Sequence, residues 1–242
     1  MTACKKIGSV MLMTLLVMTA LIQGAAASEI DLNIPMLDVS YNIWGYATTG
    51  SQLLLYGIGI CVLGMLFGFY EFVKIKGMPA HKLMLNVSET IYETCKTYMK
   101  QQAKLLVLLE VFIAACIFYY FFYLNATPLP KVLTILGWSI LGILGSFSVA
   151  WFGMRINTYA NSRTAFDSLK AKPFSVMSLP LRSGMSIGVL LICVELIMMI
   201  AILLFVDRES AGACFVGFAI GESLGASALR ICGGIFTKIA DI

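Results

Sequence analysis

Long apolar runs separated by short polar stretches dominate the pattern of this chain. A helix needs about 20 consecutive apolar residues to cross the hydrocarbon core of a bilayer. Five runs reach that length. The pattern therefore predicts an all-α fold, a polytopic membrane helix bundle with about five transmembrane helices. The expected spans are 52–73, 105–124, 132–154, 184–206 and 212–239.

A shorter apolar segment opens the chain. Two lysines precede a mostly apolar stretch over 7–22, and three alanines follow at 25–27. A basic start, an apolar core and small residues before a cleavage point are typical of a secretory signal. Residues 1–27 are predicted to be a cleaved signal peptide or, alternatively, an uncleaved signal-like helix. Residues 28–50 then form a polar segment on the outer side.

Glycines recur within the predicted spans at the spacing of a helix turn. Gly64 and Gly68 are four residues apart, and so are Gly217, Gly221 and Gly225. Small residues at this spacing let the backbones of neighbouring membrane helices approach closely. The spans are therefore expected to pack into a bundle.

The polar stretches between the spans differ sharply in charge. Segment 74–104 holds six lysines and segment 155–182 holds five lysines or arginines, whereas 125–131 and 207–211 hold one each. Lysine and arginine concentrate in cytoplasmic loops. The two basic segments are therefore predicted to be cytoplasmic and the mature N-terminus to lie outside, in a multi-pass integral membrane protein (of the inner membrane in a bacterium).

The first basic segment is expected to be helical. Glu89 and Glu93 are followed by lysines at intervals of four residues. Such a pattern supports an exposed helix. No helix breaker separates Lys104 from the next span, and Ser88 beside Glu89 is a candidate cap. Polar residues of 155–182 are expected to continue the third span in the same way. The bundle is therefore predicted to carry cytoplasmic helical extensions.

Composition narrows the class of protein further. The chain is 60% hydrophobic and 12% charged. Soluble domains carry about 25% charged residues, so this composition argues against a soluble enzyme. No basic run with interleaved aromatics indicates a nucleic-acid partner.

The cysteines and the histidine give no sign of a metal site. The seven cysteines contain no CxxC pair. They are interpreted as small apolar packing residues rather than as a disulfide or zinc framework. The single histidine, His81, lacks a nearby Cys or His. It is expected in a loop or at headgroup level.

Charged residues reappear in the last predicted span. Arg230 lies about two turns inside it. An intramembrane arginine needs water or an acidic partner, for which Glu110 and Glu195 are candidates. At about 100° per residue, Arg230 and Asp241 share one helix face, and Lys238 lies about 80° from Arg230. A snorkelling Lys238 and a solvated Asp241 at the helix end remain alternatives to a functional role.

Three segments carry a resemblance to a known family. Residues 230–241 (RICGGIFTKIAD) resemble the motif R-x-G-G-G-I-[FY]-T-K-x-A-D of membrane-integral, ion-pumping pyrophosphatases. Residues 153–165 (GMRINTYANSRTA) are similar to the family's G-M-x-x-x-x-x-A-N-x-R-T, and residues 88–102 resemble its long helix after the first span. The resemblance covers most of residues 50–242.

The resemblance implies a larger helix bundle that works as a homodimer in the lipid bilayer. It implies hydrolysis of pyrophosphate on the cytoplasmic side, with H⁺ or Na⁺ moved outward, and Mg²⁺ as cofactor with K⁺ as an optional second cation. Lys238 would contact pyrophosphate, Asp241 would bind both substrate and Mg²⁺, and Arg230 would belong to the ion gate or coupling region. Cys232 and Ile239 depart from the motif, where the family usually has glycine and a small residue.

The sequence ends one residue after Asp241, where the family continues with further acidic ligands. By resemblance, residues 28–242 are expected to be the N-terminal portion of such a pump, truncated in its last helix. This fragment, an enzyme by family, is expected to be inactive alone and to need complementation by a missing C-terminal part. The alternative is a non-catalytic membrane subunit or scaffold derived from such a pump.

Overall fold

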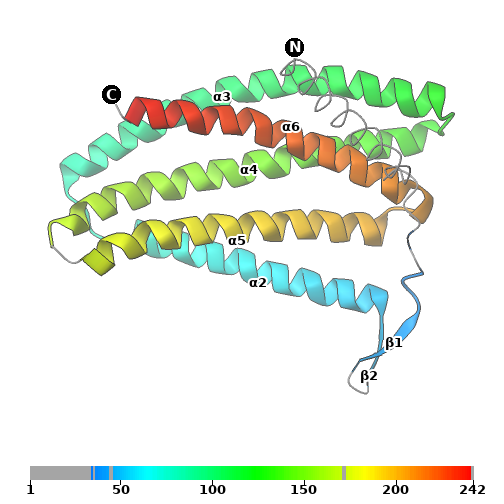
Figure 1. Cartoon of the computed structure of the whole chain (residues 1–242), viewed down its shortest axis with the longest axis horizontal. Helices are drawn as coiled ribbons and strands as arrows, with labels where there is room; N and C mark the ends of the chain where they lie inside the picture. The colour runs from blue at the N-terminus through cyan, green and yellow to red at the C-terminus, as the bar shows by residue number, and fades with distance from the viewer. Residues whose placement is uncertain (1–33, 35, 44–45, 171–172, 241–242) are drawn as a thin grey trace, which may run out of the picture.

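The structure, a computed structural model, is a bundle of five long helices with a small β-hairpin at one end (Figure 1). It describes residues 34, 36–43, 46–170 and 173–240, and beyond residue 227 the only described side chain is that of Arg230. The predicted signal-like segment 1–27 lies outside these residues. The elements are β1 (Ser40–Ile43), β2 (Tyr46–Thr49), α2 (Gly50–Lys76), α3 (Lys82–Phe118), the π-helix η2 (Tyr119–Leu124), α4 (Leu129–Ser168), α5 (Pro173–Phe205) and α6 (Arg208–Ala240).

The hairpin occupies the predicted polar segment, for which the sequence pattern predicts no strand. β1 and β2 pair antiparallel, with Ser40 opposite Thr49. Thr49 then caps α2, because its hydroxyl accepts from the N–H of Gln52 at 3.4 Å. The Gln52 side chain returns the contact by accepting from the N–H of Thr49 at 3.2 Å. This capping box makes the hairpin run directly into α2.

Four helices of the described chain are long and apolar enough to cross a membrane: α2, α3 continued by η2, α4 and α5. They correspond to the first four predicted spans. The fifth predicted span is present as the helix α6, but it is not among these candidates within the described residues. Its described part is rich in glycine, alanine and serine, which lowers its hydropathy. Such small residues suit a helix packed inside a bundle.

The helical extensions are confirmed, and they exceed the predicted spans. α3 is 37 residues long and α4 is 40, so the polar segments beside the spans are part of the same helices. α5 starts at Pro173, well before the predicted span, and accommodates Pro180 in its interior. Proline is well suited to a helix start because its N–H is not needed there.

The start of α3 differs from the prediction. His81 is the N-cap residue, and its Nδ1 accepts from the N–H of Leu83 at 3.3 Å. Ser88 lies more than one turn further along the helix and donates to the carbonyl of Thr158 in α4 at 2.7 Å. The predicted cap at Ser88 is therefore wrong: its hydroxyl joins two helices.

Glycines lie at the contact between α6 and α4, which is the most extensive one between two helices of the described chain. A Cβ at Gly217 would lie 2.8 Å from the carbonyl oxygen of Ile135, and a Cβ at Gly221 would overlap the backbone of Ser139. On the other side of the bundle, Gly64 of α2 abuts the Cys193 sulfur of α5. Both predicted glycine series therefore face a neighbouring helix, as their spacing indicates.

The core between α4, α5 and α6 is apolar and contains buried cysteine. Val132, Ile135, Ile202 and Phe218 surround Cys214, which is fully buried. Cysteines at positions 61, 95 and 193 are also buried, and each of the described cysteines is a free thiol. The interpretation of cysteine as a small packing residue is confirmed for these positions.

Candidate functional site

The two basic segments and the end of α6 come together at one end of the bundle (Figure 1, left). The ends of α2, α4 and α6 meet the starts of α3 and α5 there. The opposite end carries the hairpin and the α3–α4 and α5–α6 connections. We call the first end the basic end, defined by residues 74–82, residues 155–182 and the last turns of α6.

The stretch of α4 that carries the family resemblance, residues 153–165, reaches three other helices. Asn157 accepts through Oδ1 from the hydroxyl of Ser183 in α5 at 2.7 Å. The carbonyl of Thr158 accepts from Ser88 in α3 at 2.7 Å. Arg163 donates through Nη2 to the carbonyl of the last residue of α2 at 2.9 Å. The motif therefore ties four helices together at the basic end.

Arg155 anchors α4 to α3 by two kinds of contact. Its guanidinium pairs with Glu89 at 3.3 Å, and its Cζ lies 3.7 Å from the ring centre of Tyr92 and 4.5 Å from that of Tyr159. A planar guanidinium suits both contacts, since it stacks on aromatic faces while it donates to a carboxylate. The charges of the α3 extension are thus partly neutralised across the helix pair.

A buried ion pair joins α2 to α5. Arg182 donates to Glu71 at 2.8 Å, and the Glu71 side chain is only 6% exposed. The Oε2 atom of Glu71 has no hydrogen-bond partner among the described residues. A carboxylate in such surroundings depends on its cation, because an unpaired buried charge is strongly unfavourable.

The structure describes two of the three predicted site residues, and both lie on one helix. Arg230 lies in α6 and is exposed, and no ion pair joins it to a carboxylate of the described residues. Glu110 is one of the carboxylates that the sequence offers as a partner for Arg230. Both of its carboxylate oxygens are buried and have no hydrogen-bond partner among the described residues. Lys238 lies in the last turns of α6, and Asp241 falls outside the described residues. The roles of Arg230, Lys238 and Asp241 therefore stay predictions.

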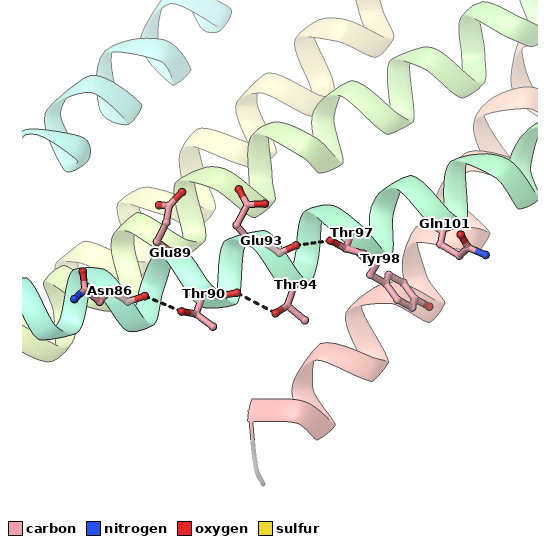
Figure 2. Close-up of a pocket in the computed structure, with 8 residues that line it drawn as sticks. All are labelled: Asn86, Glu89, Thr90, Glu93, Thr94, Thr97, Tyr98 and Gln101. Atoms are coloured by element: carbon pink, nitrogen blue, oxygen red, sulfur yellow. Dashed lines mark hydrogen bonds between the residues drawn. The ribbon is translucent and has the colours of Figure 1, made fainter.

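A large open cavity lies along one face of α3 (Figure 2). Its volume is about 1030 Å³. The threonines along it bond to their own helix: Thr90 donates to the carbonyl of Asn86 at 3.1 Å and Thr94 to that of Thr90 at 2.9 Å. Its carboxylates are paired, Glu89 with an arginine of α4 and Glu93 with a lysine one turn away at 3.0 Å. These threonine hydroxyls and carboxylates already have partners within the protein, so they are not available as hydrogen-bonding groups for a small ligand.

Magnesium needs several oxygen ligands, usually carboxylates with water. The part of the chain that the structure describes contains no group of three or more acidic, histidine or cysteine side chains able to hold a metal ion. The predicted ligand Asp241 lies outside the described residues.

The ion pairs that join helices at the basic end are not evident in the sequence pattern. Glu71 and Arg182 are far apart in the chain, and Arg155 is notable in the sequence only as one charge of a basic segment. One signal is present: Glu71 is an isolated carboxylate at the end of an apolar run. Such charges are rarely left unpaired. Its partner depends on the helix arrangement.

The long apolar helices and the charged end of the bundle define the class of protein: it is an integral membrane protein built as a polytopic helix bundle. Comparison with known proteins then gives the family. The family described as "Inorganic H+ pyrophosphatase" matches residues 62–242, and the chain belongs to it. No solved structure matches the chain.

Three relatives share the name "K(+)-insensitive pyrophosphate-energized proton pump". The chain is 57% identical to the one from Chlorobaculum tepidum over 188 residues, which cover 78% of this chain and 25% of the relative. It is 28% identical to that of Methanosarcina mazei over 175 residues (72% and 24%). It is 27% identical to that of Pyrobaculum aerophilum over 195 residues (78% and 26%). The chain spans about a quarter of the length of these relatives.

Proposed function

We propose that this chain is part of a pump that couples pyrophosphate hydrolysis to outward H⁺ transport. The observation that carries the proposal is the charged motif on α6, at the end of the bundle where both basic segments meet. The 57% identity to a named proton pump over 188 residues supports it. In this proposal Lys238 and Asp241 form one edge of the pyrophosphate site.

The basic end faces the cytoplasm in this proposal. The positive-inside rule supports that orientation, and it puts the end of α6 on the side where pyrophosphate is available. Lys238 then neutralises phosphoryl oxygens, and Asp241 contributes a carboxylate to Mg²⁺. Phosphoryl transfer depends mainly on positioning and charge neutralisation, so a cation and a metal-binding carboxylate are the groups such a site requires.

Arg230 serves in the ion gate or coupling region in this proposal. Its side chain on α6 is exposed and so is available to a helix outside the described bundle. A charge at membrane depth requires an acidic partner or water. Glu110 offers both of its carboxylate oxygens, which are buried without a hydrogen-bond partner among the described residues. The transported ion is H⁺ and K⁺ is not required, because the relatives carry those properties in their names.

Hydrolysis requires further helices in this proposal. A pyrophosphate–magnesium site needs several carboxylates, and this chain offers Asp241 with Lys238. The matched relatives are about four times as long as the stretch they share with it. The remaining ligands then come from segments equivalent to the rest of those relatives, in an assembly that is a homodimer when complete.

The test is a complementation assay in inverted membrane vesicles. The chain is produced alone and together with the remaining three quarters of the Chlorobaculum relative as a separate polypeptide. Phosphate release and acidification of the vesicle lumen are measured with pyrophosphate and Mg²⁺. We expect both activities in the complemented vesicles only, unchanged when Na⁺ and K⁺ are omitted. Hydrolysis by the chain alone would contradict the need for further helices.

Within that assay, Lys238→Ala should raise the pyrophosphate KM by about tenfold, as expected for the loss of one charge-assisted contact. Lys100→Ala, which removes an exposed lysine of α3, is the control and should leave the KM unchanged. Equal KM values for the two variants would contradict the role of Lys238. A stable complex with the second polypeptide but no hydrolysis would favour the alternative, a non-catalytic subunit or scaffold.

A further inference from the structure

A smaller cavity at the basic end has the chemistry of an anion site. It has a volume of about 300 Å³ and lies between the α2–α3 connection, α4 and α5. Since a water molecule occupies about 30 Å³ in the liquid, a phosphate group and several waters fit within it. The polar side chains that line it are Arg163, Asp167, Lys170, Ser175, Ser178 and Arg182.

Arg163 is the buried cation among the described residues that line this cavity. The residue is 6% exposed, and its two terminal nitrogens are held by neutral acceptors: the carbonyls of Lys76 at 2.9 Å and Tyr159 at 3.3 Å, and the hydroxyl of Ser162 at 3.0 Å. Its Nε is buried with no hydrogen-bond partner among the described residues. A guanidinium has five donors and stays charged, so this arrangement leaves both a donor and a positive charge unmatched.

Two further cations line the cavity, and each is paired with a carboxylate. Lys170 pairs with Asp167 at 2.6 Å, but its side chain remains 55% exposed. Arg182 pairs with Glu71 at 2.8 Å, stays 33% exposed and is part of the lining. Three cations therefore line the cavity, and the carboxylates of Asp167 and Glu71 offset two of them, which leaves one positive charge in excess.

The first turns of α5 form part of the cavity wall. α5 begins at Pro173, and Ser175 and Ser178 of its first turns are part of the lining. The first N–H groups of a helix lack intrahelical partners and carry a partial positive charge, which favours phosphate. Ser175 donates to Asp167 and Ser178 to the carbonyl of Ser175, so the hydroxyls organise this turn.

We propose that this cavity binds a phosphate group, held by Arg163 and Lys170 at the start of α5. The site uses none of the residues of the Lys238–Asp241 motif and is independent of the proposed pump function. Phosphate at the surface of a membrane bundle has two sources, the headgroup of an anionic phospholipid and free inorganic phosphate. Basic cavities between membrane helices bind anionic headgroups by the same chemistry.

The lipid arm of the test uses the full chain in detergent, titrated with phosphatidylglycerol or phosphatidylcholine and followed by native mass spectrometry. Lys170→Gln should weaken phosphatidylglycerol binding roughly fivefold, the effect of one basic residue near a headgroup. The matched control is Lys131→Gln, which removes an ion-paired lysine at the opposite end of the bundle. Arg163→Gln should weaken binding further if the variant folds.

The second arm uses inorganic phosphate as the probe. A rise in melting temperature with millimolar phosphate, seen for the wild type and Lys131→Gln but lost in Lys170→Gln, identifies free phosphate as the ligand. A difference between these variants in the lipid arm alone identifies the lipid headgroup. If neither probe distinguishes Lys170→Gln from Lys131→Gln, the cavity does not bind phosphate and the proposal is wrong.

Discussion

At the level of single residues, the basic end is organised by arginines that each serve a different partner. Arg155 pairs with a carboxylate and stacks on tyrosines, Arg163 donates to backbone carbonyls, and Arg182 neutralises a buried carboxylate. Replacing arginine by lysine at such positions should remove contacts, because the lysine ammonium has no planar fork of donors and no flat face that stacks on an aromatic ring.

Arg155→Lys should therefore lower the free energy of unfolding by about 1 kcal/mol, since the charge is retained while the stacking and the planar fork of donors are lost. The stacking partner that loses its contact is Tyr92. Unfolding in mixed micelles, followed by tryptophan fluorescence, measures the change. Glu89→Gln is the matched variant, because it weakens the ion pair and leaves the stacking intact. A Lys variant as stable as the wild type would show that the tyrosine contacts add nothing.

The ion pair between Lys131 and Glu209, at the end of the bundle opposite the basic end, predicts that the stability of the fold depends on pH. The Lys131 ammonium, 3.0 Å away, holds the pKa of the Glu209 carboxyl below its ordinary value. A carboxyl with a lowered pKa stabilises the fold above its ordinary pKa, which is about 4.3 for glutamate. That contribution is lost as pH falls through the lowered value.

The melting temperature of Glu209→Gln should accordingly lie slightly below that of the wild type at neutral pH and converge with it in acid. Both charges are partly or fully exposed. The difference should therefore be small and should shrink in high salt. A difference that persists at low pH and in high salt would mean that Glu209 acts through packing. Thermal scans over the pH range provide the measurement.

At the level of elements, the helices were predictable because each apolar run is long and uninterrupted. The polar extensions of α3 and α4 were predicted as well, but the exact helix ends and the early start of α5 at Pro173 were not, because they depend on contacts with other helices. Ser88 illustrates this: it has the composition of a cap, yet its hydroxyl bonds to α4. The β-hairpin was also missed, since strands of four residues leave little periodic pattern.

The α6–α4 contact gives a prediction for these elements. Gly221→Ala should destabilise the bundle by about 2 kcal/mol, which is within the usual range for overpacking. The reason is that the added Cβ would overlap the backbone of Ser139. Gly59→Ala is the matched control, since nothing lies within 4 Å of a Cβ there. That variant should be neutral or stabilising through helix propensity. Unfolding in mixed micelles compares the two, and equal effects would argue against the close contact.

Across the bundle as a whole, five helices alternate in direction, so both basic segments fall at the same end (Figure 1). Three arginines of these segments, Arg155, Arg163 and Arg182, make contacts that join α2, α3, α4 and α5. The basic end therefore carries the contacts of these arginines, the cavity proposed to bind phosphate and the end of α6.

This arrangement predicts accessibility from opposite sides of the membrane. In a cysteine-free background, Lys170→Cys should react with an impermeant thiol reagent from the cytoplasm only, and Lys131→Cys from the outside only. Labelling of intact cells and inverted vesicles makes the comparison. Both positions are exposed or half-exposed, so lack of access does not explain a one-sided result. Labelling with the reverse sidedness would contradict the proposed orientation.

Composition and local spacing were enough to predict the class, the approximate spans, the glycine faces and the family resemblance, because each of these depends on neighbouring positions in the chain. Which charges meet became known only from the packed bundle. Glu71 pairs with Arg182, Glu89 pairs with Arg155, and Arg163 is buried against the end of α2. These contacts join residues more than 60 positions apart, so they depend on helix packing in three dimensions, which no local pattern records.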